Sequence, residues 1–382
     1  MGTLIINGLV YKNAERAFLP LDILCEGDKI AAIEEKGSIT PDGHEVFDAA
    51  GRLLIPGLID VHTHGRDGYD FNTADIENMK KMAEGYASSG VTTVMPTLAS
   101  APFEEMMRAA ERINNAIPSE KGAAFCGVHL EGRYLNPAKK GAHALEYLAA
   151  LDANELCAPE LEQCRALHIS AAYELDGDGS FSAKAKELGA TLALGHTCAT
   201  YAEARKAEER GVSAYAHLFN AMPPLHHREG GAVAACLTGN AYAEMICDGI
   251  HIAPEMVALA YRCKGEKLSL VSDSMEATGA PDGEYSIAGN PVTVKDGKAL
   301  THDGALAGST LTLDVAVRNL MRFCDIPLCE AIICATEAPA KEVGIFDTCG
   351  SIDAGKRADL LIIDSDTEDF KIEKIMLRGR FI

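Results

Sequence analysis

The sequence is short of basic side chains. It has 35 lysines and arginines against 56 aspartates and glutamates, which gives a formal net charge of −21 over 382 residues. This balance argues against a surface that binds nucleic acid or another polyanion, and against a basic face that docks on a membrane. An anionic substrate would therefore have to be held by a local group of positive or polar side chains.

Other absences narrow the class of protein further. No uninterrupted apolar run reaches the roughly 18 residues of a membrane-spanning helix, and the first residues, MGTLIINGLVY, lack a basic leader. No G-x-S-x-G motif occurs, which disfavours a serine hydrolase. The 12 cysteines include no C-x-x-C pair, and several lie inside apolar segments. We therefore expect reduced thiols and a cytoplasmic protein.

The two ends of the chain have a β-like pattern. Residues 1–50 alternate short apolar runs with the turn signals Asn7-Gly8 and Gly27-Asp28, which are typical of hairpins. Residues 345–382 contain strand-like runs again, such as ADLLIID. We predict that residues 1–50 and 345–382 together form one small β-sandwich domain.

From residue 51 the pattern changes to short apolar runs that alternate with helical segments rich in Ala, Glu and Lys. Eight runs follow one another: GLIDVHTH, VTTVMPT, AFCGVHLEG, RALHISAAYE, TLALGHT, SAYAHLFN, AEMICDGIH and LSLVSDS. This alternation predicts a parallel, TIM-like (β/α)8 barrel over residues 51–344, since that fold takes ~250 residues.

Side chains that can bind a metal end six of these eight runs. They are His62 and His64 in the first run, Glu131 in the third, His196 in the fifth, His217 in the sixth, His251 at the end of the seventh, and Asp273 in the eighth. The carboxyl ends of barrel strands converge on one mouth, where active sites lie. His62 and His64 are spaced i, i+2, so both rings project from one face of their strand.

Each histidine taken alone is more often a hydrogen-bonded structural residue than a ligand. Several buried imidazoles and carboxylates around one mouth need a partner, however, and a cation supplies it. Nitrogen and carboxylate donors suit Zn²⁺, Fe²⁺, Mn²⁺ or Co²⁺ and do not choose among them. Because three protein ligands and a water suffice for one catalytic ion, we predict one or two divalent ions.

A natural division puts His62 and His64 on one ion and His196 and His217 on the other. Glu131 is then shared between the ions or held by the second. A bound ion would lower the pKa of its water toward ~7. Asp273 could take the proton of that water and return it to a leaving amine.

Seven motifs occur in order over nearly the whole chain: DVHTHG, HLEGRYLNPAKKGAH, LGHTCATY, AHLFNAMPPLHHREGG, CDGIH, LVSDSMEATG and LAGSTLTL. With these motifs the sequence resembles the N-acetylglucosamine-6-phosphate deacetylase family of the amidohydrolase superfamily. The resemblance implies hydrolysis of N-acetylglucosamine-6-phosphate to glucosamine-6-phosphate and acetate, in amino-sugar catabolism. The alternatives are N-acetylgalactosamine-6-phosphate and another N-acyl substrate.

The resemblance also implies roles for individual residues. Glu131, His196 and His217 would hold the main catalytic metal, Asp273 would act as general base and then acid, and His143 would polarise the acetamide carbonyl. The substrate phosphate would be bound by Asn220, Ala221, Arg228 and His251. In this family Arg228 would reach across the interface of a homodimer from the partner subunit. Since the chain keeps both His62 and His64, the resemblance favours the two-metal form.

Two positions depart from the family pattern. Arg133 and Gly230 stand where the family commonly has proline.

Dihydroorotase-like and hydantoinase-like amidohydrolases bridge two metals with a carboxylated lysine on the fourth strand, but the fourth run, ALHISAAYE, has no lysine. A metal-free barrel that serves as a scaffold would be expected to lack ligands, and none is missing.

Overall fold

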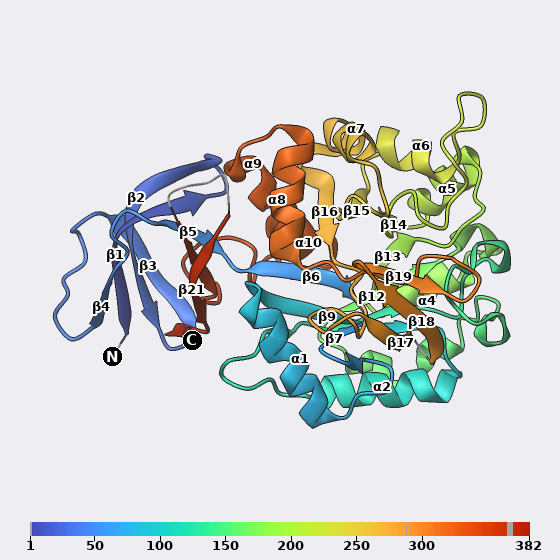
Figure 1. Ribbon diagram of the computed structural model, residues 1–382, viewed down its shortest axis with the longest axis horizontal. Coiled ribbons are helices and arrows are strands. Elements are labelled where there is room, and N and C mark those ends of the chain that lie inside the picture. Colours follow the sequence, from blue (N-terminus) through green and yellow to red (C-terminus); the bar gives the residue numbers. More distant parts are fainter. Residues whose placement is uncertain (1, 288, 365–369) are drawn as a thin grey trace.

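The computed structural model describes residues 2–287, 289–364 and 370–382. Figure 1 shows a small β domain beside a larger body in which helices surround a set of strands. Both chain ends lie in the small domain, close to each other.

One sheet of eight strands forms the small domain. Its strands are β1 (Thr3–Lys12), β2 (Ala17–Glu26), β3 (Lys29–Glu35), β4 (Glu45–Asp48), β5 (Leu53–Pro56), β20 (Leu360–Ile363), β21 (Ile372–Leu377) and β22 (Arg380–Phe381). The antiparallel pair β5 and β20 joins the strands of the two chain ends. This confirms the prediction that both ends build one small β domain.

The sheet forks at β1, where β4 pairs with the first half of the strand and β5 with the second. A register shift in β1 separates the two halves, and Asn7, at this point, has φ +56°. Apolar side chains from both branches, among them Ile23 of β2 and Ile362 of β20, are buried in one common core. β5 belongs to this sheet although it lies within the range 51–344 predicted for the barrel; the domain boundaries themselves stay a prediction.

Eight parallel strands form the barrel, as the sequence predicts. They are β6 (Leu58–Thr63), β9 (Val91–Ala99), β11 (Val128–Glu131), β12 (Leu167–Ala171), β13 (Thr191–Leu194), β14 (Val212–Tyr215), β15 (Tyr242–Ile246) and β16 (Leu268–Val271). Each strand pairs with its neighbour in this order, and the short β10 (Ala124–Phe125) adds to the edge of β9. The barrel closes where the backbone N–H of Asp273 donates to the carbonyl of His62 at 2.9 Å, next to a bridge between Thr63 and Ser274.

Helices connect the barrel strands and cover their outer side (Figure 1). They are α1 (Ile76–Ser88), α2 (Phe103–Asn115), α3 (Pro159–Glu162), α4 (Ser180–Glu187), α5 (Tyr201–Glu209), α6 (Gly231–Thr238), α7 (Pro254–Lys264), α8 (Leu313–Cys324), α9 (Leu328–Ala335) and α10 (Glu337–Glu342). Short 3-10 helices are η1 (Pro137–Lys139), η2 (Leu145–Tyr147), η3 (Glu155–Cys157), η4 (Tyr173–Leu175) and η5 (Gly265–Lys267). Across the described residues, every helix is too short or too polar to cross a membrane.

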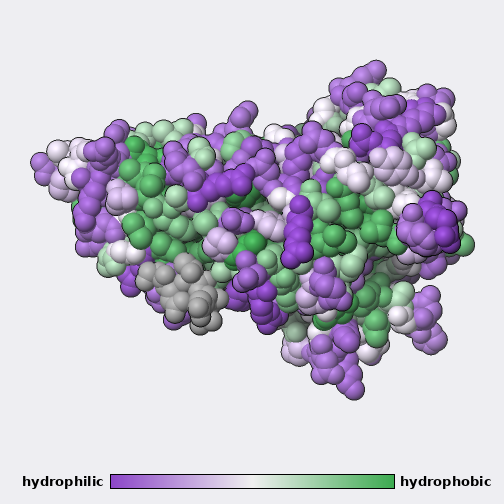
Figure 2. Space-filling view, turned by 90° about the horizontal axis from the view of Figure 1, so that it is seen from above, coloured by the Kyte–Doolittle hydropathy of each residue, from purple (hydrophilic) through white to green (hydrophobic). Residues whose placement is uncertain are grey.

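Local sequence explains where these helices begin and which face they bury. α5 starts with a capping box, in which the Thr200 side chain and the Glu203 side chain satisfy each other's backbone N–H groups. α2 buries Met106, Ala110 and Ile113, a spacing of four and three residues that turns one face to the barrel. From above, polar residues cover much of the surface and apolar ones show between them in several areas (Figure 2).

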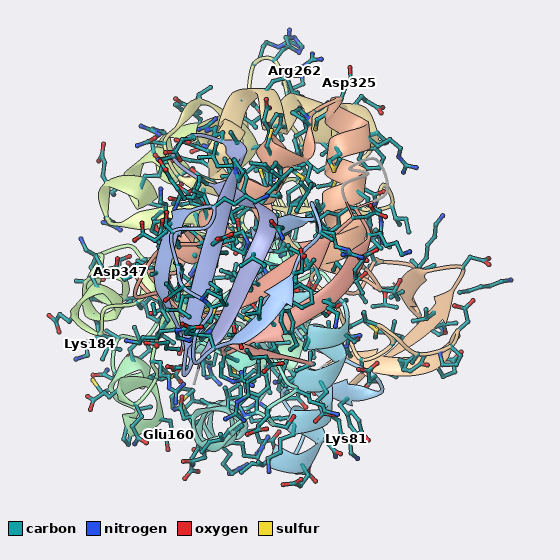
Figure 3. The ribbon with its side chains drawn as sticks, turned by 90° about the vertical axis from the view of Figure 1, so that its left-hand side faces the viewer. Lys81, Glu160, Lys184, Arg262, Asp325 and Asp347 are labelled. Atoms are coloured by element: carbon teal, nitrogen blue, oxygen red, sulfur yellow. The ribbon has the colours of Figure 1, made fainter. Side chains whose placement is uncertain are left out.

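The sequence analysis missed a three-stranded antiparallel sheet that follows β16. It consists of β17 (Gly283–Ile287), β18 (Asn290–Lys295) and β19 (Lys298–Thr301) and projects from the side of the barrel (Figure 3). Asp296-Gly297, both at positive φ, turns the chain between β18 and β19. Asp67-Gly68 does the same between the short strands β7 (Gly65–Arg66) and β8 (Tyr69–Asp70). Asp-Gly is a strong hairpin signal, so the sequence did carry the information.

Candidate metal centre

The carboxylate of Glu131, the last residue of β11, lies at the centre of the barrel mouth. Its Oε1 is 2.8 Å from Nε2 of His217 and 3.3 Å from Nε2 of both His62 and His196. Its Oε2 is 3.0 Å from Nε2 of His64. All five side chains are buried. The structure therefore brings together the four histidines and the glutamate that the sequence analysis selected.

Asp273 lies beside the first two histidines. Its Oδ1 is 3.3 Å from Nε2 of His64 and 3.7 Å from Nε2 of His62. Asp273, His196 and His217 each follow their strand by two residues and have φ of +48°, +45° and +28°. This left-handed region is uncommon for residues other than glycine and costs about 1–3 kcal/mol per residue. Such strain clusters at functional sites, which agrees with a role for the three side chains.

Hydrogen bonds at the far side of two rings determine which nitrogen faces Glu131. Nδ1 of His196 lies 2.7 Å from the carbonyl oxygen of Lys139, and Nδ1 of His62 lies 2.7 Å from a carboxylate oxygen of Glu244. Both oxygens accept, so in the neutral ring Nδ1 carries the proton and Nε2 has the lone pair. In addition, Nε2 of His196 and Nε2 of His217 are only 3.1 Å apart.

The residues present fit a divalent cation. Lone pairs of imidazole nitrogens and carboxylate oxygens face one another, and Nε2 of His62 has no hydrogen-bond partner among the described residues. Burial by itself would lower the pKa of His62, but the Glu131 and Glu244 carboxylates outweigh it and raise that pKa above its usual value. In His64, hydrogen bonds to Asp273 and Glu131 outweigh burial and raise the pKa to about 9. The site therefore favours a positive charge, which a metal ion supplies.

His143 approaches Glu131 from the loop that follows η1, with its Nε2 3.7 Å from Oε2. Its Nδ1 accepts the backbone N–H of Ser100 at 3.2 Å. The proton of the neutral ring therefore sits on Nε2, which points toward Glu131. Burial lowers the pKa of His143 to about 4, so the ring is neutral at pH 7. His143 is thus a hydrogen-bond donor in the mouth, whereas a metal ligand would need a free Nε2.

A pocket of about 370 Å³ opens onto these groups. Its lining includes His64, Glu131, His143, His196, His217 and Asp273, and also Asn220, Ala221 and His251. Lys139 and Lys140 lie in the same lining, and Ile287 and Leu306 add an apolar wall. The two lysines, which the sequence analysis did not select, place local positive charge in an otherwise acidic molecule.

Two predicted site residues are outside the lining of this pocket. One is His62, which is buried against Glu131, and the other is Arg228. Arg228 is exposed and lines a separate groove of about 770 Å³ together with Tyr201 and Pro223. A single chain therefore does not bring Arg228 to the substrate pocket. Its predicted reach into the site of a partner subunit stays a prediction.

Arg133 stands in a backbone conformation that proline cannot adopt. Its φ is +50°, whereas the proline ring holds φ near −65°. Its guanidinium pairs with Glu155 at 3.1 Å and lies outside the pocket lining. The arginine therefore brings no unpaired charge to the mouth. At Gly230 a Cβ would lie only 2.4 Å from the Cβ of Ala234 in α6, so this close approach favours glycine over proline.

Sequence reasoning also missed a set of polar side chains inside the barrel, below the mouth. They are His129, His168, Glu244 and Glu342, all buried. The signal for Glu244 was present, because it is a charged residue in the middle of the apolar run AEMICDGIH. The position of Glu342 on the short helix α10 gave no such signal.

The chain is similar to known proteins over most of its length. The model of the amidohydrolase family matches residues 53–382. N-acetylglucosamine-6-phosphate deacetylase of Vibrio furnissii is 34% identical over 370 residues, which cover 93% of this chain and 91% of the relative. N-acetylgalactosamine-6-phosphate deacetylase of Escherichia coli O157:H7 is 35% identical over 354 residues and 92% of each chain.

Two solved structures share the whole fold. The N-acetylglucosamine-6-phosphate deacetylase of Pasteurella multocida superposes with a TM-score of 0.92 at 31% identity, covering 100% of both chains. A Mycobacterium smegmatis N-acetyl-D-glucosamine-6-phosphate deacetylase mutant, solved in complex with N-acetyl-D-glucosamine-6-phosphate, gives a TM-score of 0.89 at 28% identity, covering 100% of this chain and 99% of the other.

Proposed function

This chain belongs to the amidohydrolase family, and we propose that it hydrolyses the acetamide of N-acetylglucosamine-6-phosphate, releasing acetate and glucosamine-6-phosphate. The observation that carries the proposal is the meeting of four imidazole Nε2 atoms and Asp273 around Glu131 at the end of one pocket. The similarity to deacetylases of 6-phosphorylated amino sugars over more than nine-tenths of the chain supports the substrate class.

We assign the metal ligands by their positions. Glu131, His196 and His217 would hold the main ion, and His62 and His64 would hold a second one with Glu131 shared. A divalent ion in this place supplies a Lewis acid that polarises the amide carbonyl and makes water a better nucleophile. The donor set leaves the identity of the metal open.

Asp273 is proposed to move the proton. Burial raises the pKa of its carboxyl, but the hydrogen bond to His64 and the charge of His62 outweigh burial, so that pKa lies below its usual value. The carboxylate is therefore ionised at neutral pH and can take a proton from the attacking water. It then returns this proton to the nitrogen of the leaving amine, which is otherwise a poor leaving group.

His143 is proposed to stabilise the developing charge on the carbonyl oxygen of the substrate. Its Nε2–H points into the mouth, and the neutral ring keeps this proton throughout the reaction. A preorganised donor aimed at that oxygen stabilises the transition state more than the ground state.

Asn220, Ala221 and His251 are proposed to hold the phosphate. All three line the pocket, and Lys139 and Lys140 in the same lining add positive charge. Arg228 would come from the partner subunit. These residues would supply the local positive charge that an anionic substrate needs in an otherwise acidic protein.

We further propose that the protein is a cytoplasmic homodimer. Its twelve cysteines, all of them described, are free thiols. Reduced thiols are typical of the cytoplasm. The loop that carries Arg228 also exposes Leu225, with 42% of its surface accessible, beside the groove of Tyr201 and Pro223. Light scattering on the purified protein measures the mass of the assembly directly, and a monomeric mass would contradict this proposal.

A substrate panel tests the function. Acetate release is measured with N-acetylglucosamine-6-phosphate, N-acetylgalactosamine-6-phosphate and unphosphorylated N-acetylglucosamine, with metal analysis on the same sample. We expect the first substrate to give the highest kcat/KM. A higher value for the galactosamine isomer would move the function to that of the Escherichia coli relative. Equal turnover with and without phosphate would contradict the phosphate pocket.

A further inference from the structure

Glu244 lies in the middle of β15 and points into the barrel, below the pocket. Neither Glu244 nor His62 exposes any surface to solvent. The Glu244 side chain is outside the lining of the substrate pocket. Glu244 can therefore influence the reaction only through other residues.

One carboxylate oxygen of Glu244 contacts a member of each predicted pair of metal ligands. Its Oε2 is 2.7 Å from Nδ1 of His62, and it accepts the backbone N–H of His217 at 3.2 Å. His62 lies in β6 and is paired with His64, whereas His217 follows β14 and is paired with His196. A single buried group thus connects the two halves of the site.

We infer that Glu244 is a positioning residue of the metal centre, which fixes the tautomer and orientation of His62 so that the Nε2 lone pair faces Glu131. A carboxylate oxygen accepts only, so His62 must donate through Nδ1. Nε2 is then the nitrogen that remains for a metal, 3.3 Å from Oε1 of Glu131. A carboxylate on the far side of the ring also makes the ligand nitrogen more basic.

The other oxygen of Glu244 faces a second buried group of polar atoms. Oε1 is 3.4 Å from Nε2 of His168, and the carboxyl of Glu342, from α10, completes the group. Within the described residues, Oε1 of Glu244 and both oxygens of Glu342 lack hydrogen-bond partners. Burial raises the pKa of Glu342, and the neighbouring Glu244 raises it further.

His168, Glu244 and Glu342 lie close enough together to bind a cation of their own, which is the competing interpretation. In that case Glu244 would be a ligand in a third site, and its replacement would remove that ion. The two interpretations predict different behaviour for Glu342. A positioning role needs the Glu244 carboxylate, whereas a third site needs both carboxylates.

The experiment compares three variants of the full chain with the wild type. Glu244→Leu removes the acceptor, Glu244→Gln keeps a neutral acceptor of the same size, and Glu342→Gln changes the neighbouring carboxyl that does not touch His62. Metal affinity and content are measured by titration and elemental analysis. The protonated ring nitrogen of His62 is read in the zinc-loaded protein from histidine ¹H–¹⁵N spectra, with the signal assigned by its loss in His62→Gln.

We expect the wild type to carry the His62 proton on Nδ1. Glu244→Leu should weaken metal binding at the His62 and His64 site by about 10- to 100-fold, the range typical for such a partner of a ligand. Glu244→Gln should lose less and keep the tautomer, and Glu342→Gln should bind like the wild type. If Glu244→Leu does not fold, a weakening confined to the same site in Glu244→Gln still supports the inference.

Three results would overturn it: a proton on Nε2 of His62, unchanged affinity in both Glu244 variants, or a third ion that Glu342→Gln removes. The inference rests on the proposed function for the metal site, but these measurements do not use the substrate. Inactivity of a wild type with the expected tautomer and metal pattern would contradict the deacetylase proposal alone.

Discussion

The two halves of the barrel mouth differ in their depth. His62 and His64 come from one strand, and of these two only His64 lines the pocket, whereas His62 is sealed from solvent and held from behind by Glu244. His196 and His217 follow two neighbouring strands and both line the pocket. The H-x-H pair, which is the plainest signal in the sequence, thus includes His62, which does not line the pocket. We call the pair His62 and His64 the sealed half, because His62 lies behind the pocket lining, and the pair His196 and His217 the open half.

The largest effect should come from Glu131, because it contacts both halves. Glu131→Ala removes the carboxylate that lies within 3.3 Å of Nε2 of all four histidines. We expect loss of nearly all bound metal and of deacetylation, measured by elemental analysis and acetate release. Retention of one full equivalent of metal would show that one half of the site works without Glu131.

A substitution of Asp273 distinguishes a loss of proton transfer from a loss of metal binding. Asp273→Asn keeps the size of the side chain but cannot accept a proton, so we expect kcat to fall by about 10²- to 10⁴-fold, the usual contribution of a general base. The metal content should stay close to that of the wild type. Full activity of this variant would sink the proposed proton route.

The two halves can be compared directly through one histidine from each. His62→Ala should lose about half of the bound metal, since a second ion needs the first pair, whereas His217→Ala should lose the main ion and the activity. Both variants are analysed for metal per chain after the same purification. Unaltered metal content in His62→Ala would make the sealed half structural.

A substitution of Arg228 tests whether a residue of the partner subunit completes the substrate site. Arg228→Ala should raise KM for the phosphorylated substrate by about 10- to 100-fold, as expected for a hydrogen bond to a charged group, and leave turnover of the unphosphorylated sugar unchanged. Mixed with Asp273→Asn and allowed to exchange subunits, it should regain about a quarter of the wild-type sites, because each hybrid dimer has one intact site. No recovery on mixing, with exchange verified, would place Arg228 outside the partner's pocket.

The smallest effect should follow from replacing Arg133, which comes two residues after Glu131 in the sequence. Its charge is paired with Glu155 and lies outside the pocket lining. Arg133→Ala should therefore change kcat/KM by less than about twofold, within the usual range for a side chain away from the chemistry. A change in the ratio of glucosamine to galactosamine substrate would show that the loop influences sugar choice after all.

The sequence predicted the barrel, and which side chains gather at its mouth, because both depend on short-range sequence patterns. Alternating strands and helices indicate a (β/α)8 barrel, and residues at strand ends then have to meet, as Glu131 and His217 do. The role of Glu244 could not be predicted in this way. Whether a residue inside an apolar run faces the barrel interior or the helices depends on the register of the strand, which the run does not reveal.

Other features needed information beyond one strand. Lys139 reaches the pocket from η1, on a long connection after β11 whose helices are too short to show a periodic pattern. His143 lies on the same connection and was selected only through the family resemblance. The sheet of β17, β18 and β19 was missed despite its Asp296-Gly297 turn, because it lies outside the alternation of strands and helices that predicts the barrel. The position of Arg228 relative to the substrate depends on a second chain, which one sequence cannot place.

Stepwise return of metal to the metal-free protein tests the central claim most directly. The protein is stripped with a chelator, and acetate release from N-acetylglucosamine-6-phosphate is followed as Zn²⁺, Mn²⁺, Fe²⁺ or Co²⁺ is added in counted equivalents. If the reaction depends on metal at the barrel mouth, the stripped protein should have almost no activity. Two equivalents per chain of a suitable ion should then restore the activity completely. Full activity in the stripped protein would contradict the account.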